Sequence, residues 1–262
     1  IASQMSVMRS SLLGSLLQVL KFNLDRKAER VRVFEVGRVF LRDASVKSTD
    51  STVEGFDQPM RVAALAYGGV DTLQWGRKEQ GADFFDAKGD VEALLAPRRA
   101  TFEAAEHPAL HPGRCARVLV NGVAIGFVGE LHPKWRQGYN LTHAPMLFEL
   151  ALDAVLARDV PVFKPVAKYQ VVARDIAVIV PEVVTHAALM AAVHAAAAGG
   201  LLRDATLFDV YRPQQAGGGM NEGEKSLAVR LTLNSDDATL ADEQIDAQVQ
   251  AVIGQLTRQF GA

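Results

Sequence analysis

The sequence has few of the features that mark secreted, membrane or disulfide-bonded proteins. Cys115 is the only cysteine among 262 residues, which excludes an intrachain disulfide and favours a reducing, cytoplasmic setting. No apolar run approaches the roughly 20 residues that span a bilayer, so we expect no membrane contact. No signal peptide opens the chain, and because it begins at Ile1 rather than methionine we expect a piece of a longer protein.

Basic and acidic residues are nearly balanced. The chain has 28 Lys and Arg residues against 30 Asp and Glu residues, and its net charge of -2 provides no general attraction to nucleic acid. The hydrophobic content of 49% is typical of a globular protein. The length of 262 residues allows one large domain or two ordinary ones.

A proline-bearing stretch divides the sequence into two parts. Pro161 and Pro165 each favour extended backbone at the preceding residue, which is typical of a linker. We therefore expect a first domain at residues 1–157, a linker at 158–168 and a second domain at 169–262.

The second domain has the clearer pattern. Apolar residues alternate with small or polar ones from Ser226 to Leu233, which indicates a strand with one buried face. Thr185 and Thr239 are suited to cap two helices, the latter with Asp242 in a variant capping box. The predicted elements are a strand at 174–180, a helix from 185 to 198 stopped by Gly199-Gly200, a strand at 205–212, a loop at Gly217-Gly218-Gly219, a strand at 226–233 and a helix from 239 to 260. Their order, βαββα, is that of a ferredoxin-like fold without its last strand, so we expect truncation or disorder at that end.

The first domain is predicted to mix helices and strands. A helix capped by Ser11 extends to about Leu24 and is apolar over much of its circumference, so it is either a central core helix or a partner interface. Asn121-Gly122 is a strong signal for a two-residue hairpin. Residues 43–58 are polar and predict a mobile loop. The other predicted elements are strands at 31–41, 60–68, 115–121, 123–130 and 145–152 and a helix at 87–95.

Two patterns resemble chemical sites but have plainer interpretations. Residues Gly218 to Ser226 are similar to a phosphate-binding loop, but Glu224 interrupts the Gly-Lys-Ser sequence. A strand is predicted to follow this loop, whereas phosphate binding needs the N-terminus of a helix. Ser10 and Ser11 lack a local base that would make either of them a nucleophile, so helix capping is the simpler role.

A metal site is also suggested by spacing alone. The candidate ligands are His107, His111, Cys115 and His132. Spacings of four residues would bring the first three together on a helix, but Pro108 and Pro112 oppose a helix there. We therefore expect a loop that leads into a hairpin, and no metal.

Several short strings occur in the order found in one protein family. The strings in the second domain are Arg174-Asp175-Ile176-Ala177-Val178, Phe208-Asp209-Val210-Tyr211 and Lys225-Ser226-Leu227-Ala228. The strings in the first domain are Met8-Arg9-Ser10-Ser11-Leu12-Leu13, Val33-Phe34-Glu35-Val36-Gly37, Phe85-Asp86-Ala87-Lys88-Gly89-Asp90, His111-Pro112-Gly113-Arg114-Cys115-Ala116, Gly129-Glu130-Leu131-His132-Pro133 and Phe148-Glu149-Leu150. With them, the chain resembles the C-terminal portion of the bacterial phenylalanyl-tRNA synthetase beta subunit over almost its whole length.

The resemblance implies an α+β protein. Its first domain would be a class II synthetase-like domain built on an antiparallel sheet, and its second a ferredoxin-fold anticodon-binding domain. The first domain would be catalytically inactive and would dock the catalytic alpha subunit in an (αβ)2 assembly. The whole enzyme would join phenylalanine to tRNA(Phe) with ATP and Mg²⁺, whereas no cofactor is expected in this chain. The editing domain would precede Ile1.

The residues themselves support the loss of catalysis. A class II site needs an arginine at the ATP phosphates and a Gly-rich third motif that ends in arginine. Residues Val33 to Gly37 contain no complete motif of this kind, and no arginine follows Phe148 until Arg158. We therefore expect no catalytic residue in this chain.

The candidate RNA contacts lie on the strands of the second domain. The resemblance implies an anticodon that begins with guanine, and the Asp209 carboxylate could accept hydrogen bonds from the two donors of its Watson–Crick edge. Ser226 would lie beside Asp209, and Tyr211 could stack on a base. Asp209 and Tyr211 are predicted to share one face of their strand, opposite Phe208 and Val210. The predicted phosphate contacts are Arg174, Arg212, Lys225 and Arg230. A plainer interpretation of Asp209 and Arg174 is a structural salt bridge.

The second domain is too acidic to bind RNA strongly by itself. Residues 163–262 contain 8 Lys and Arg and 11 Asp and Glu, a net charge of -3. We therefore predict that it reads the anticodon only while the rest of the enzyme holds the tRNA. Two alternatives are a stand-alone RNA-binding or regulatory module, and an independent ligase active site.

Overall fold

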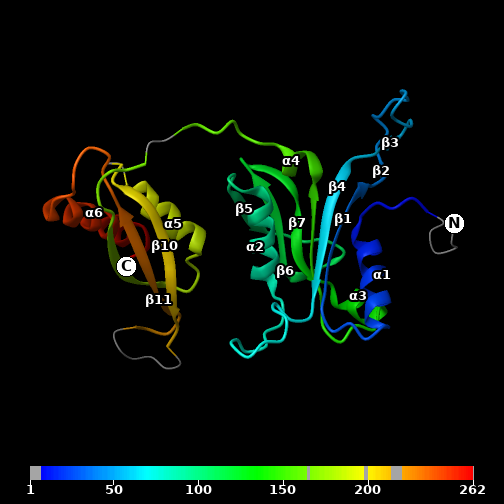
Figure 1. Ribbon diagram of the computed structural model, residues 1–262, viewed down its shortest axis with the longest axis horizontal. Helices are drawn as coiled ribbons and strands as arrows, with labels where there is room; N and C mark the ends of the chain where they lie inside the picture. Colours follow the sequence, from blue (N-terminus) through cyan, green and yellow to red (C-terminus); the bar gives the residue numbers. More distant parts are fainter. Residues whose placement is uncertain (1–6, 164–165, 198–199, 214–219, 262) are drawn as a thin grey trace. The chain divides into compact units, whose positions relative to one another are not determined.

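The computed structural model describes residues 7–163, 166–197, 200–213 and 220–261. The chain forms two compact units that divide between Pro161 and Val162 (Figure 1), and we call them the N-terminal unit and the C-terminal unit. The predicted loop at Gly217-Gly218-Gly219 and the predicted helix stop at Gly199 lie outside the described residues. Within the described parts of the chain, no helix has both the length and the apolar character needed to cross a lipid bilayer.

The N-terminal unit is built on a six-stranded sheet in which all neighbours are antiparallel. The strand order is β1-β4-β8-β7-β6-β5. The elements are α1 (Leu13–Leu24), β1 (Val31–Arg38), β2 (Leu41–Arg42), β3 (Phe56–Asp57), β4 (Met60–Tyr67), α2 (Phe84–Leu95), β5 (Ala100–Ala104), β6 (Leu110–Val120), β7 (Val123–Leu131), α3 (Pro133–Gly138), β8 (Met146–Ala151) and α4 (Leu152–Leu156). The predicted antiparallel sheet is therefore confirmed.

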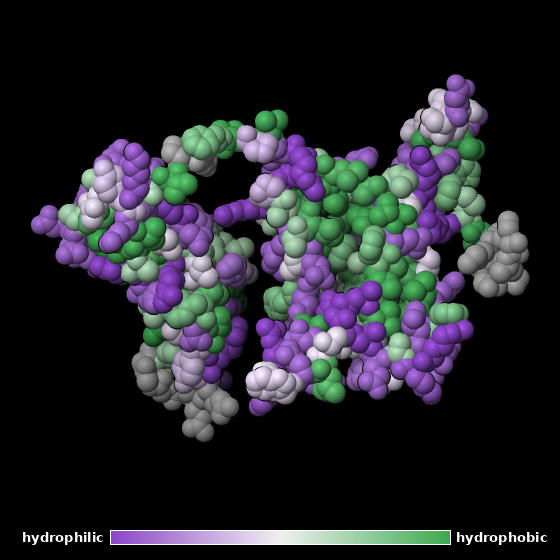
Figure 2. All heavy atoms as spheres, in the orientation of Figure 1, coloured by the Kyte–Doolittle hydropathy of each residue, from purple (hydrophilic) through white to green (hydrophobic). Residues whose placement is uncertain are grey.

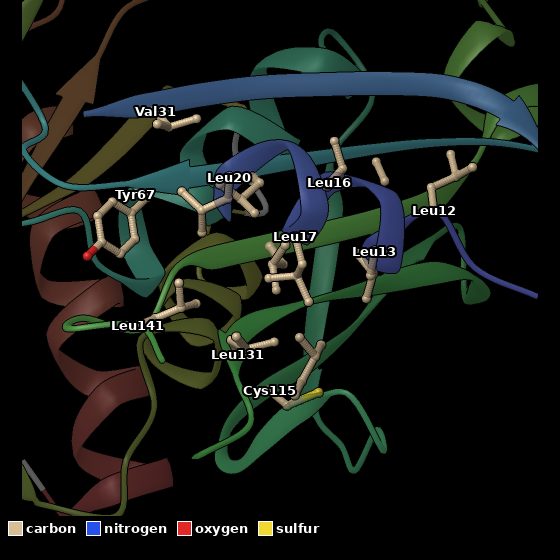
Figure 3. Close-up of a cluster of buried hydrophobic side chains, with 14 of the residues drawn as sticks. Leu12, Leu13, Leu16, Leu17, Leu20, Val31, Tyr67, Cys115, Leu131 and Leu141 are labelled. Carbon is tan, nitrogen blue, oxygen red and sulfur yellow. The ribbon is translucent and has the colours of Figure 1, made fainter. Parts of the chain in front are cut away.

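Alternation along the strands gives this sheet a hydrophobic core on each face. On β4, Ala63 and Leu65 pack with α1, while Val62 and Ala66 belong to the core beneath α2. The two helices cover opposite faces of the sheet (Figure 1). The side chains of α1 point into the first core (Figure 3), and the fully or largely buried ones are Leu13, Leu16, Leu17 and Leu20. α1 is therefore buried on one side only, since Val19 and Phe22 are exposed, and it is not the central core helix that was one of the two alternatives.

Local signals explain several element boundaries. Asn121 and Gly122 have φ angles of 51° and 77°, as the predicted two-residue hairpin requires. The helix predicted at 87–95 begins earlier, at Phe84, because Asp83 and Asp86 form a reciprocal capping box. The strand predicted at 31–41 ends at Arg38. The polar segment predicted as a mobile loop is closed at its two ends by the pairing of β2 with β3.

The C-terminal unit has the predicted order βαββα. Its elements are β9 (Val172–Pro181), α5 (His186–Ala195), β10 (Leu202–Tyr211), β11 (Glu224–Leu233) and α6 (Asp242–Phe260). The strands form an antiparallel sheet in the order β10-β11-β9, so β11 is central. Both helices pack on one face of the sheet through a core that includes Val178, Val229, Leu231, Val193 and Leu256.

The caps of the two helices differ from each other. Thr185 caps α5 as predicted, since its hydroxyl accepts a hydrogen bond from the Ala188 amide at 3.2 Å. The prediction that α5 runs to Ala198 is wrong, because the helix ends at Ala195. The predicted cap Thr239 is also wrong: α6 begins after Ala241, whose amide donates to the Gln244 side chain at 3.0 Å. Gln244 therefore closes the first turn from inside the helix.

Candidate nucleic-acid interface

One face of the C-terminal sheet carries no helix. On central strand β11, Leu227, Val229 and Leu231 point into the core, so the residues between them point to the other side. The register of β10 and β9 against β11 then assigns the rest of this face. We call it the open face, and by register it contains Asp204, Thr206, Asp209 and Tyr211 of β10, Glu224, Ser226, Ala228, Arg230 and Thr232 of β11, and Asp175, Ala177 and Ile179 of β9.

The three predicted base contacts meet on the open face. Tyr211 lies directly opposite Ser226, and Asp209 lies opposite Ala228, so Asp209 and Ser226 are diagonal neighbours. Side chains in such diagonal positions are roughly 7–8 Å apart, which long groups and a bound base can bridge. Tyr211 is 58% exposed. Asp209 is exposed and makes no hydrogen bond or ion pair with any described residue, so its carboxylate faces solvent.

A β-bulge changes the faces predicted for β10. The register shifts between Leu207, which pairs with Val229, and Asp209, which pairs with Ala228, so Phe208 is the extra residue. The guanidinium carbon of Arg230 lies 5.3 Å from the centre of the Phe208 ring, and Arg230 belongs to the open face. The prediction that Phe208 lies opposite Asp209 is therefore wrong. The bulge brings Asp209 and Tyr211 onto the same face as the Phe208 ring, which sequence reasoning missed.

The four predicted phosphate contacts occupy different positions. Arg230 makes two hydrogen bonds of 2.8 Å to Asp175 across the sheet. These hydrogen bonds from Arg230 lower the pKa of the Asp175 carboxyl and raise the pKa of the Arg230 guanidinium. Arg212 lies just beyond β10 and makes a bidentate ion pair with Glu182, which lowers the pKa of Glu182 in the same way. Both cations are therefore paired within the unit.

The other two cations point away from the open face. Lys225 is only 7% exposed on the helix-covered side, where its Nζ donates to the Glu182 carbonyl at 2.8 Å. A buried ammonium in this position cannot reach a phosphate, so the prediction for Lys225 is not supported. Arg174 pairs in register with core residue Leu231, and its exposed side chain donates to the Ala173 carbonyl at 3.1 Å. Neither Arg174 nor Asp209 forms the alternative salt bridge within the described residues.

The open face is therefore acidic. Among its described register positions the one cation is Arg230, which is already paired with Asp175. Its other carboxylates are Asp204, Asp209 and Glu224. Such a face repels the RNA backbone but can accept hydrogen bonds from the edge of a base.

The charged residues of the N-terminal strings are occupied by internal contacts. Glu35 of β1 forms an ion pair with Arg9 and accepts a hydrogen bond from the Ser15 hydroxyl at 2.6 Å. The Arg9 guanidinium crosses directly over Gly37, where a Cβ would overlap it. Glu149 of β8 accepts hydrogen bonds from the Ser11 hydroxyl at 2.8 Å and the Leu12 amide at 2.7 Å. These strings therefore tie α1 to the sheet.

The candidate metal ligands also have structural roles. The Nδ1 atoms of His107, His111 and His132 each accept a hydrogen bond from a backbone amide two residues later, at 3.2, 3.0 and 3.0 Å. Cys115 is buried in the first core, and burial raises its thiol pKa. Within the described ranges, no group of three or more His, Cys, Asp or Glu residues could hold a metal ion.

The N-terminal unit exposes apolar side chains on its edge strand. β1 ends the sheet, and Phe34 and Val36 on its α2 side are 75% and 46% exposed. Val19 and Phe22 of α1 are also exposed, at 41% and 56%. Figure 2 shows hydrophobic side chains gathered over the sheet of this unit between α4 and β1. Clusters of this kind are typical of protein–protein contacts.

Two family profiles match the chain. The one described as "Phenylalanyl tRNA synthetase beta chain CLM domain" matches residues 1–152. The one described as "Ferredoxin-fold anticodon binding domain" matches residues 167–262, which contain the open face. The predicted α+β fold with a ferredoxin-like second domain is thereby confirmed.

Curated relatives agree with these matches. The chain is 48% identical to a phenylalanine–tRNA ligase beta subunit of Cupriavidus pinatubonensis over 266 aligned positions, which cover 100% of the chain and 33% of the relative. It is 50% identical to the corresponding subunit of Burkholderia pseudomallei, with the same coverage. For Dechloromonas aromatica the identity is 46%, over 100% of the chain and 32% of the relative. The chain thus spans about a third of the length of these relatives. Because the first profile covers more than half of its residues, the chain belongs to the phenylalanyl-tRNA synthetase beta chain family.

Proposed function

We propose that this chain acts within a phenylalanine–tRNA ligase, where its C-terminal unit reads the anticodon of tRNA(Phe). The observation that carries the proposal is the Asp209 carboxylate on the open face, which has no hydrogen-bond or ion-pair partner among the described residues, with Ser226 and Tyr211 beside it. A carboxylate is a hydrogen-bond acceptor only. It matches the two adjacent N–H donors of guanine and would repel a base that presents acceptors there.

The neighbours of Asp209 complete the base site. The Ser226 hydroxyl can donate to or accept from a base edge, and the exposed Tyr211 ring provides a stacking surface. Stacking on an aromatic side chain contributes about 1–3 kcal/mol per base. A hydrogen bond to a charged group contributes about 1.5–3 kcal/mol. Base recognition by these three residues is therefore strong enough to discriminate between anticodons.

The acidity of the open face determines how this site is used. Phosphate neutralisation supplies most of the affinity in nucleic-acid binding, and this face has no unpaired cation by register. We propose that other parts of the enzyme hold the tRNA, and that this unit adds specificity. Arg174 and Arg212, which lie outside the open face, are the proposed contacts to flanking phosphates, Arg212 at the expense of its ion pair with Glu182.

We propose that the N-terminal unit docks the catalytic alpha subunit in an (αβ)2 assembly. Support comes from the apolar side chains exposed on β1, which lie at the edge of the sheet and include Phe34. Glu35 and Glu149 are occupied by contacts that hold α1, so they support architecture rather than catalysis. ATP and Mg²⁺ would then act in the alpha subunit, and the assembly would work in the cytoplasm.

The test replaces Asp209 in the full ligase. Asp209→Ala should lower kcat/KM for charging of wild-type tRNA(Phe) by about 10- to 150-fold, which corresponds to the loss of a charged hydrogen bond. It should have little effect on a tRNA changed at the first anticodon base. Asp204→Ala is the matched control, because it removes a carboxylate from the same strand and the same face. If Asp209→Ala slows the charging of both tRNAs equally, base reading by Asp209 is wrong.

Two further measurements address the alternatives. Tight binding of tRNA by the isolated chain would favour a stand-alone RNA-binding module, which the acidic open face argues against. ATP–pyrophosphate exchange without an alpha subunit would establish an independent ligase site. We expect neither result.

A further inference from the structure

The bulge in β10 creates a second feature on the open face. Phe208 is 53% exposed, and the Arg230 guanidinium lies 5.3 Å from its ring centre. Alternation from Leu207, which faces the core, places Phe208 on the open side, and the register shift after it turns Asp209 to the same side. The bulge therefore puts Asp209 next to an exposed aromatic ring on one face.

The ring has a fixed support. Two hydrogen bonds of 2.8 Å to Asp175 hold the Arg230 guanidinium, and Asp175 belongs to β9 on the far side of the central strand. A bidentate pair of this kind fixes both the position and the plane of the guanidinium. Phe208 and Arg230 thus form a pre-organised π surface, and binding to such a surface loses little side-chain entropy.

We propose that Phe208, supported by Arg230, is a stacking site for a second unpaired nucleotide of the anticodon loop. The proposal rests on the function proposed above and extends it from one base to two. Asp209 and Ser226 would choose the first base by its edge, whereas Phe208 would hold its neighbour by its face. Because every base has a π face, the Phe208 site should accept any base.

The spacing of the two sites defines the ligand. Phe208 and Tyr211 are three positions apart on β10, but the bulge makes this span equal to between two and three regular steps, roughly 7–10 Å along the strand. Bases that remain stacked on each other are only about 3.4 Å apart. The two nucleotides must therefore be splayed, which single-stranded loops permit and duplexes do not. The open face should select an unpaired RNA segment over a helix.

The test uses the full ligase and two tRNA(Phe) probes. In each probe, 2-aminopurine replaces the nucleotide on one side of the first anticodon base, because its fluorescence falls when it stacks on an aromatic ring. Wild-type enzyme should quench one of the two probes. Phe208→Leu should abolish that quenching and raise the Kd for tRNA by about 5- to 150-fold, equally for tRNAs that differ at the first anticodon base.

Two more variants separate stacking from damage to the fold. Phe208→Tyr keeps the ring and should keep both the quenching and the Kd. Val210→Leu is the control on the same strand, since Val210 pairs with core residue Leu227 and points away from the open face. It should leave the quenching of the probe unchanged.

The outcomes distinguish this proposal from the one on which it rests. If Phe208→Leu leaves Kd and both probes unchanged while Asp209→Ala abolishes first-base preference, the second site is wrong and anticodon reading stands. If neither variant changes binding, both proposals fail. If Phe208→Leu alters first-base preference itself, the two sites are not separate and the proposal is overturned.

Discussion

Glu149 provides the sharpest test of whether the sequence strings of the N-terminal unit hold α1 on the sheet. Its carboxylate accepts hydrogen bonds from the Leu12 amide at 2.7 Å and the Ser11 hydroxyl at 2.8 Å. The Ser11 hydroxyl in turn accepts a hydrogen bond from the Leu13 amide at 3.1 Å. Ser11, the predicted cap, therefore lies one residue before the N-cap position, which is Leu12. A residue of β8, 137 positions away from Leu12, thus completes the cap of α1.

The expected magnitude follows from these contacts. Hydrogen bonds to a charged acceptor contribute about 1.5–3 kcal/mol, and a helix cap about 0.5–2 kcal/mol. These effects overlap at one carboxylate that is partly exposed to solvent, so we expect Glu149→Ala to cost about 2–3 kcal/mol. For a unit of this size, 1 kcal/mol shifts the melting temperature by roughly 2–4 °C, which gives about 4–12 °C.

Tryptophan fluorescence reports on this unit selectively. The chain has two tryptophans, Trp75 and Trp135, and both lie in the N-terminal unit. Trp135 is the useful probe, because its indole donates to the Pro108 carbonyl at 3.2 Å. Glu92→Ala is the matched control: it removes a carboxylate whose pair with Lys88 lies on the surface of α2, and such pairs contribute about 0.3–0.5 kcal/mol.

A double-mutant cycle identifies the contact that matters. Glu149→Ala and Ser11→Ala should show a coupling energy above about 0.5 kcal/mol, as expected for residues in one network. Glu149→Ala should also lower the pKa of His107 further, since burial already lowers it and the charge of Glu149 opposes that effect. NMR titration of His107 measures this shift. If the Glu149→Ala variant has the same melting temperature as the Glu92→Ala control, Glu149 does not cap α1.

Two further predictions concern backbone approach and pH. Gly126→Ala should destabilise the N-terminal unit by about 1–3 kcal/mol, because the new Cβ would overlap the Glu149 carbonyl. Gly138→Ala is the control, since a Cβ at Gly138 would meet open space. Urea unfolding followed by Trp135 fluorescence compares the two variants. In the C-terminal unit, hydrogen bonds from Arg230 and Arg212 keep the pKa values of Asp175 and Glu182 below their ordinary 3.8 and 4.5. The stabilisation of the fold by these two pairs is complete above the ordinary pKa values and is lost as pH falls through the lowered ones. Circular dichroism melts should show this acid sensitivity, and equal melting at pH 7 and pH 3 would contradict it.

Patterns confined to a short stretch of sequence were the ones that could be predicted. Asn121-Gly122 determines its own turn, and the alternation from Ser226 to Leu233 identifies a strand with one buried face. By contrast, β5 is a short edge strand whose order comes from pairing with β6, and no local signal predicts it. The start of α2 was visible in sequence, as Asp83-x-x-Asp86, and was overlooked.

The candidate site was predictable in composition but not in its faces. Asp209, Tyr211 and Ser226 were expected to meet on the helix-free side of the sheet, and the register brings them together there. Strict alternation, however, would place Leu207 and Asp209 on the same face, although one is apolar and the other charged. That conflict is the only sequence signal of the bulge. It does not say which residue is extra, and only the pairing with β11 assigns that role to Phe208.

The pairing of the cations explains why this unit should depend on the rest of its protein. Arg230 and Arg212 stabilise the sheet and its connections through Asp175 and Glu182, and Lys225 is buried. Arg230 and Lys225 are thereby withdrawn from the RNA backbone, while Asp209 makes no hydrogen bond or ion pair within the described residues. A face whose carboxylates outnumber its cations can reject wrong bases, but it cannot attract a polyanion. Base discrimination without affinity is effective only when another surface delivers the RNA, so adding salt should weaken tRNA binding to the full enzyme without removing its preference for the first anticodon base.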